Sequence, residues 1–186
     1  MDSALWAFGR VSGVISLALF TATVLLGILT RSGRPLFTVP RFSVALVHRN
    51  ISLLATVFLA LHVGALLLDS FAKLNVTDVV VPFLGSFKPF WQGLGTVAFD
   101  LVLALLVTGL MRHRLGQRTF RAIHWLSYAM WPIALAHAIG NGTNGTSKWF
   151  LLLAVASVVV VVGGAVLWRM SATFLETAKA RQGGLS

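Results

Sequence analysis

Five apolar segments, each about 20 residues long, dominate this chain of 186 residues. A helix of that length crosses the roughly 30 Å hydrocarbon core of a bilayer. In lipid such a segment must be helical, because nothing there pairs an open backbone N–H or C=O. We therefore expect an all-α fold: a polytopic membrane helix bundle of about five transmembrane helices, forming a single domain over residues 1–186. The expected spans are 11–30, 43–68, 93–111, 121–140 and 149–168.

The composition supports a membrane location and excludes several soluble functions. The chain is 57% hydrophobic and only 11% charged. It has no cysteine, which excludes disulfides, covalently attached c-type haem and thiolate metal sites. The net charge of +10 does not indicate a nucleic-acid partner, because the arginines cluster in loops between apolar segments. We expect an integral protein of a cell membrane, a bacterial plasma membrane, surrounded by the lipid bilayer.

Lysine and arginine are distributed unevenly between the two sides of the predicted bundle. Eleven lie in the loops and tail on one side, and four lie on the other. Positively charged loops remain in the cytoplasm. The distribution therefore predicts an N-terminus outside and a C-terminus in the cytoplasm.

Two pairs of histidines lie in the second and fourth segments. His48 and His62 are fourteen positions apart, and His124 and His137 are thirteen positions apart. Both separations come to roughly 20 Å along a helix. The predicted topology makes both segments run outward, so His48 can face His124 near the cytoplasm and His62 can face His137 near the outer side. Facing histidines are a natural axial ligand set for b-type haem, and the spacing predicts two stacked haems.

The two pairs differ in their direction around the helix axis. Fourteen positions make nearly four whole turns, so His48 and His62 share a helix face. Thirteen positions leave His137 well away from the direction of His124. Pro132 lies between them and is expected to kink the helix and help to re-aim His137.

The pattern of two histidines fourteen positions apart on one helix, followed two helices later by two histidines thirteen positions apart, resembles the ferric reductase-like transmembrane domain. That family includes NADPH oxidases, ferric reductases and the haem subunit of periplasmic methionine sulfoxide reductase. The sequences LVHRN, RAIHWLSYAMWP and ALAHAIG also fit. The resemblance covers roughly residues 11–168. It implies two non-covalent b-type haems: an inner one ligated by His48 and His124, and an outer one ligated by His62 and His137.

One feature of the family is missing. Its oxidases and eukaryotic reductases carry a cytoplasmic flavin- and nicotinamide-binding region after the last span, whereas here only a short tail follows Trp168. No glycine pattern of a dinucleotide-binding fold is present. We expect an oxidoreductase subunit that does not itself oxidise NADPH and meets flavin only through a partner or as a loosely bound molecule.

Four arginines flank the inner ends of the histidine segments. They are candidate partners for haem propionates, because a guanidinium binds a carboxylate through two hydrogen bonds. The alternative is that they set the topology and contact lipid headgroups. These residues are Arg41, Arg49, Arg112 and Arg121.

Asp100 lies within the third apolar segment, where a carboxylate is costly. It could accept the proton on a histidine's second nitrogen and so orient the ring. It could also pair with Arg10 or relay protons, and the plain alternative is a neutralised carboxyl. Trp125, Met130 and Trp131 lie between the two histidine levels, either between the haem edges or as ordinary core packing. No catalytic residue is predicted.

Three functions remain open. The first is a di-haem electron-transfer subunit that takes single electrons from a cytoplasmic flavoprotein reductase and delivers them to an outer-face redox protein or small acceptor. The second is a subunit whose haems take electrons from membrane quinol. The third is a non-redox transporter of a transition metal. It is the least favoured, because a transporter should add carboxylates or methionines beside the histidines, where this chain is mostly aliphatic and aromatic.

Overall fold

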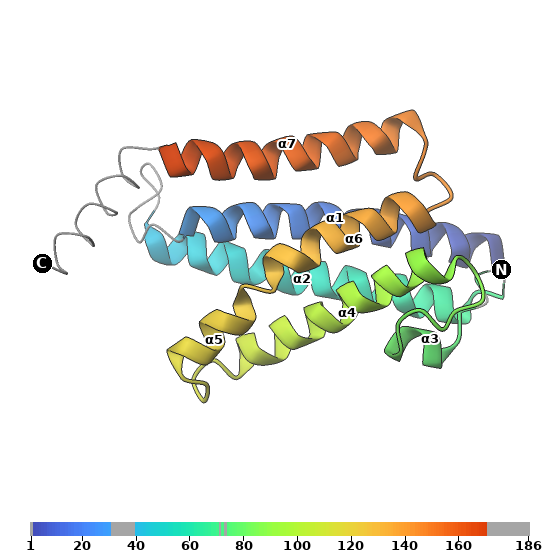
Figure 1. Ribbon diagram of the computed structural model, residues 1–186, viewed down its shortest axis with the longest axis horizontal. Helices are drawn as coiled ribbons and strands as arrows, with labels where there is room; N and C mark the ends of the chain where they lie inside the picture. The colour runs from blue at the N-terminus through green and yellow to red at the C-terminus, as the bar shows by residue number, and fades with distance from the viewer. Residues whose placement is uncertain (1, 31–39, 71, 73, 171–186) are drawn as a thin grey trace, which may run out of the picture.

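The computed structural model describes residues 2–30, 40–70, 72 and 74–170, and the regular structure in these ranges is all helical (Figure 1). The helices, in chain order, are α1 (Asp2–Thr30), α2 (Arg41–Leu68), α3 (Val76–Val80), α4 (Pro89–Leu110), α5 (Gln117–His124), α6 (Ser127–Asn141) and α7 (Lys148–Met170).

Helix boundaries follow the local sequence. Pro89 is the first residue of α4, where its missing N–H costs no helical hydrogen bond. Pro40 precedes α2 in an extended conformation, and Gly116 precedes α5 in the same way. Gly142, directly after α6, also has an extended backbone.

Four helices are long and apolar enough to cross a membrane. Their apolar stretches are Ser3–Leu29, Phe42–Leu68, Pro89–Leu110 and Lys148–Met170. They overlap the first, second, third and fifth predicted spans, which confirms the prediction of an all-α polytopic bundle. In Figure 1, α1 begins and α7 ends at opposite ends of the bundle.

The fourth predicted span is not one continuous helix. It consists of α5 and α6, which together run the length of the bundle but are separated at Trp125 and Leu126 (Figure 1). Hydrogen bonds between residues three apart replace the α-helical pattern around this point. They join the N–H of Leu126 to the carbonyl of Ile123, Tyr128 to Trp125, and Ala129 to Leu126.

The structure adds a second feature to the expected re-aiming of His137 at Pro132. α6 continues through Pro132, and the interruption comes earlier, directly after His124. Thirteen α-helical positions end roughly 140° short of a whole number of turns. Each residue in a 3₁₀ turn rotates the chain by roughly 20° more than an α-helical residue. The 3₁₀ turn thus recovers part of the missing rotation and brings His137 back toward the direction of His124.

Helix α1 lies at the centre of the packing. It contacts α2 along its length and also packs against α6 and α7, while α4 packs mainly against α6. The core includes Leu17, Phe20 and Val24 of α1 and Ala55 of α2, all buried. α2 is thus held in place by α1, and α6 is held by α4 together with α1.

The apolar segment between α2 and α4 packs against the first half of α4. The carbonyl of Asp78 in α3 accepts a hydrogen bond from the buried Thr96 hydroxyl at 2.6 Å. The Phe83 ring lies against Gly93, at a point where any larger residue would collide with it. This segment therefore covers the end of α4 that lies near His137.

Candidate functional site

The structure brings His48 of α2 and His124 at the end of α5 close together, in a T-shaped arrangement. Their ring centroids are 6.2 Å apart, and the ring planes are inclined by 70°. We call this the His48 level. His62 and His137 form a second level, the His62 level, where the two rings are close enough to interact electrostatically. The structure thus brings His48 into contact with His124 and places His62 and His137 within electrostatic range of each other.

Three of these histidines are oriented by a backbone carbonyl of a neighbouring helix. The Nδ1 of His48 lies 3.0 Å from the carbonyl oxygen of Thr23, and the Nδ1 of His62 lies 2.6 Å from that of Gly9. The Nδ1 of His137 lies 2.8 Å from the carbonyl oxygen of Trp91. A carbonyl only accepts hydrogen bonds, so each Nδ1 carries the proton and each Nε2 keeps a free lone pair. That lone pair is what a metal ligand needs.

Glycines give the same imidazoles room. A Cβ added at Gly13 would lie 2.7 Å from the Nδ1 of His62, and one at Gly95 would lie 2.5 Å from the Cε1 of His137. At Gly27 the nearest atom, the Cε1 of His48, would be 3.4 Å away, an ordinary contact. The rings of His62 and His137 therefore occupy space that any side chain at Gly13 or Gly95 would fill.

This geometry fits a b-type haem. An imidazole centroid lies about 3 Å from a metal bound to its nitrogen, so two axial histidines have centroids about 6 Å apart. The distance of 6.2 Å at the His48 level agrees with that value. Among the described residues, no group of three or more histidines, cysteines or carboxylates could hold a metal ion. A pair of histidines would suit a metal whose other four ligands come from a porphyrin.

The layer between the two levels is tightly packed. The indole Nε1 of Trp131 donates a hydrogen bond to the hydroxyl of Thr21 at 3.0 Å, and both side chains are buried. Ala55 is fully buried, and its carbonyl accepts a hydrogen bond from the Ser16 hydroxyl. Trp131 is therefore a core residue that also lies between the levels, whereas Trp125 is 51% exposed and outside the core.

Three of the four candidate propionate partners have described side chains, and all three are exposed. Arg49 directly follows His48, and Arg121 lies one turn before His124 in α5; both are exposed. Arg112 is exposed just after α4, with its Nε 3.5 Å from the Nε2 of His113. Arg41 is the first residue of α2, but its side chain lies outside the described part of the chain.

Asp100 is not brought to the histidines. It is exposed on α4 and has no hydrogen bond or ion pair with any described residue. The acceptors of the histidine Nδ1 protons are backbone carbonyls instead. Arg10, the other suggested partner of Asp100, lies over the ring of Trp6 at 4.1 Å.

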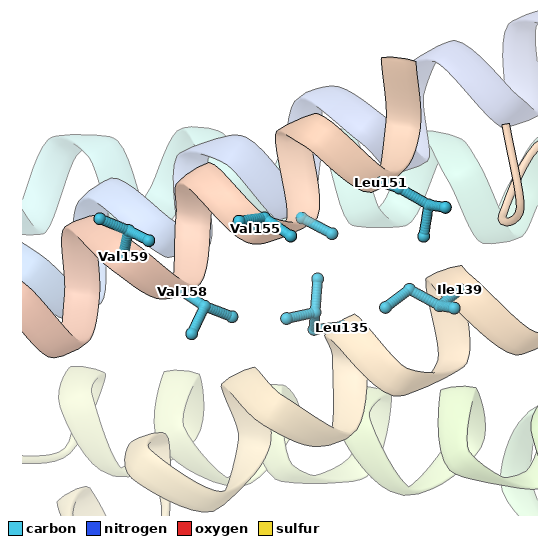
Figure 2. Close-up of a pocket in the computed structure, with 7 residues that line it drawn as sticks. Leu135, Ile139, Leu151, Val155, Val158 and Val159 are labelled. Atoms are coloured by element: carbon cyan, nitrogen blue, oxygen red, sulfur yellow. The ribbon is translucent and has the colours of Figure 1, made fainter. Parts of the chain in front are cut away.

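An apolar crevice of about 240 Å³ lies away from the histidines, between α6 and α7. In Figure 2, Leu135 and Ile139 of α6 face Leu151, Val155 and Val158 of α7. Its lining is entirely aliphatic and has no group that could bind iron or a propionate. This crevice is therefore not the candidate haem site.

The supporting residues were only partly predictable. Gly9 and Gly13 are recognisable as points of close helix approach. Gly27 and Gly95, and the three carbonyls that orient the histidines, were missed. A signal was present, because Gly13 and Gly27 have the same separation along the chain as His48 and His62.

Comparison with known families identifies a match over residues 12–135, about two thirds of the chain, to the family described as ferric reductase like transmembrane component. The matched region contains His48, His62 and His124, and His137 lies just beyond it. No curated protein and no solved structure matches the chain.

Proposed function

Because the chain belongs to the ferric reductase-like transmembrane family, whose members are haem-binding redox components of membranes, we propose that it is a di-haem b-type cytochrome subunit that carries single electrons across the bilayer. The observation that carries this proposal is the pair of facing histidines at the His48 level, 6.2 Å apart. The proximity of His62 and His137, roughly 20 Å further along the helices, supports a second haem.

Each haem b would supply reversible one-electron chemistry at its level. The histidines would hold the iron through Nε2, while the carbonyls of Gly9, Thr23 and Trp91 accept hydrogen bonds from three of the Nδ1 N–H groups. These hydrogen bonds fix the ring orientation before any cofactor binds and raise the basicity of the ligand. Gly13 and Gly95 leave room for the rings that they face.

The charged end of the bundle favours electron entry at the His48 level. Arg49, Arg112 and Arg121 are exposed there and can bind the propionates of a haem or an acidic donor protein. The excess of positive loops favours a cytoplasmic location for this end. The His62 level then lies at the outer face, where a redox protein or small acceptor takes the electron.

The layer between the levels supports electron transfer across the gap. Trp131 fills part of it, fixed by its hydrogen bond to Thr21. A packed layer excludes water and keeps the two levels at a constant separation.

The test is to purify the chain from haem-replete cells and measure haem per polypeptide and the reduced-minus-oxidised spectrum. We expect about two b-type haems per chain, as the two bis-histidine levels require. His48→Ala or His124→Ala should remove one spectral component, and His62→Ala or His137→Ala the other. A protein without haem would overturn the proposal, and loss of the same component from His48→Ala and His62→Ala would overturn the pairing.

The donor can be identified with the same preparation. Under argon, a flavoprotein reductase with NADH should reduce the haems rapidly, and added salt should slow the reaction if docking is electrostatic. Reduction by a quinol alone, at a comparable rate, would instead favour a quinol-linked subunit.

A further inference from the structure

Three of the four histidines share one supporting arrangement. A backbone carbonyl at position i of a neighbouring helix accepts the Nδ1 proton, and a glycine at position i+4 of that helix faces the imidazole. The three sets are His62 with Gly9 and Gly13, His48 with Thr23 and Gly27, and His137 with Trp91 and Gly95.

The spacing of four has a geometric cause. A helical side chain leans toward the N-terminus and covers the turn before its own Cα. The side chain at i+4 therefore lies over the carbonyl of residue i, whose oxygen already accepts the N–H of residue i+4. A glycine at i+4 uncovers that oxygen, which can then accept a second hydrogen bond from the side.

A fourth set exists in the sequence. The two sets on α1 are separated by the distance along the chain from Gly13 to Gly27. The same number of positions along α4, counted from Trp91 and Gly95, leads to Leu105 and Gly109. α4 packs against α5 as well as α6. Leu105 and Gly109 therefore lie on α4, which packs against α5, the helix that ends at His124.

In the structure, His124 does not make the contacts with Leu105 and Gly109 that the other three histidines make with their sets. The Nδ1 of His124 is buried and has no hydrogen-bond partner among the described residues. Within the same part of the chain, no atom lies within 4 Å of a Cβ built at Gly109. The side-chain contact to the Leu105 carbonyl is a long one of 3.2 Å from the hydroxyl of Thr108, whose shorter bond of 2.6 Å goes to Ala104.

We infer that Leu105 and Gly109 are positioning residues for His124: in the haem-loaded protein the Nδ1 of His124 donates to the Leu105 carbonyl, and its ring packs on Gly109. This inference rests on the proposed function. α5 can make the adjustment because none of its side chains is buried. Phe120, which stacks on His124 at 5.2 Å, lies one turn earlier on α5 and moves with it.

The test is Gly109→Val, measured by haem content and by redox titration of each spectral component. The component lost in His48→Ala identifies the haem at the His48 level. A valine at 109 covers the Leu105 carbonyl, so His124 loses its acceptor and becomes a less basic ligand. We expect that component to shift to a higher potential or to disappear, while the other component stays unchanged.

Two further variants complete the experiment. Gly163→Val places the same residue at another glycine of a membrane helix with nothing within 4 Å, and it should change neither component. Gly95→Val should affect only the component assigned to His62 and His137. If both components keep their wild-type content and potential in Gly109→Val, the inference is wrong and the proposed function stands. A wild-type protein without haem would overturn both.

Discussion

At the scale of single residues, the candidate site depends on backbone as much as on side chains. The histidines of α2 receive their orientation from carbonyls of α1, and that contact requires a close approach of two helices. Gly13 permits this approach, since any side chain there would collide with His62. The same rule applies to His137 and Gly95 across α4 and α6.

Gly13→Ala and Gly27→Ala should differ in their effect on haem content. The added methyl would lie 2.7 Å from the His62 ring in the first variant, but 3.4 Å from the His48 ring in the second. We expect Gly13→Ala to reduce the haem content from about two per chain to about one, and Gly27→Ala to leave it unchanged. Pyridine haemochrome analysis of the purified variants measures both, and greater loss in Gly27→Ala would contradict this account.

Thr21 and Trp131 should be energetically coupled through their buried hydrogen bond of 3.0 Å. Thr21→Val leaves the indole N–H buried without an acceptor, whereas Trp131→Phe leaves the hydroxyl its second bond, to the Leu17 carbonyl. A double-mutant cycle should give a coupling energy of about 1 kcal/mol. Thermal unfolding in detergent of the single and double variants measures it, and strictly additive effects would show that the bond contributes nothing.

At the scale of elements, the junction between α5 and α6 determines where His124 and His137 lie in the fourth membrane crossing. Its 3₁₀ hydrogen bonds place His124 at the end of one helix and His137 in the next. Because the two histidines lie in different helices, the orientation of one can change without that of the other. α6 is fixed to the core by Met130, Trp131 and Leu135, while α5 buries no side chain.

Pro132→Ala should therefore preserve both haems. Proline in a helix interior removes one hydrogen bond, and replacing it with alanine restores an N–H that can reach the carbonyl of Tyr128. Because the interruption lies at Trp125 and Leu126, we expect unchanged haem content and an equal or higher melting temperature. Selective loss of the haem component assigned to His62 and His137 would mean that Pro132 aims His137 after all.

At the scale of the whole molecule, α1 organises the bundle. It packs against α2, α6 and α7, and its carbonyls support one histidine at each level. Since α1 begins and α7 ends at opposite ends of the bundle (Figure 1), the two ends of the helical region should lie on opposite sides of the membrane.

Reporter fusions test this arrangement and its direction. The excess of positively charged loops predicts that a reporter after α7 is in the cytoplasm and that one before α1 is outside. We expect alkaline phosphatase to be active only at the N-terminal position and a cytoplasmic fluorescent protein only at the C-terminal position. The reverse result would exchange the assignments of the inner and outer haem, and activity on the same side would contradict the number of crossings.

The sequence by itself determined the helices and the two histidine levels. Both are local properties: apolar length decides whether a segment can cross a bilayer, and helical rise converts the separation of His48 and His62 into depth. The charged loops added an expected direction. None of these inferences requires knowledge of which helices touch.

Only the tertiary structure decided what supports each histidine. The carbonyls of Thr23 and Trp91 become acceptors because α1 and α4 approach α2 and α6 in one particular register. The break after His124 likewise did not follow from the sequence of the fourth segment. Such features depend on the relative position of two helices, and a local pattern along one of them does not determine that position.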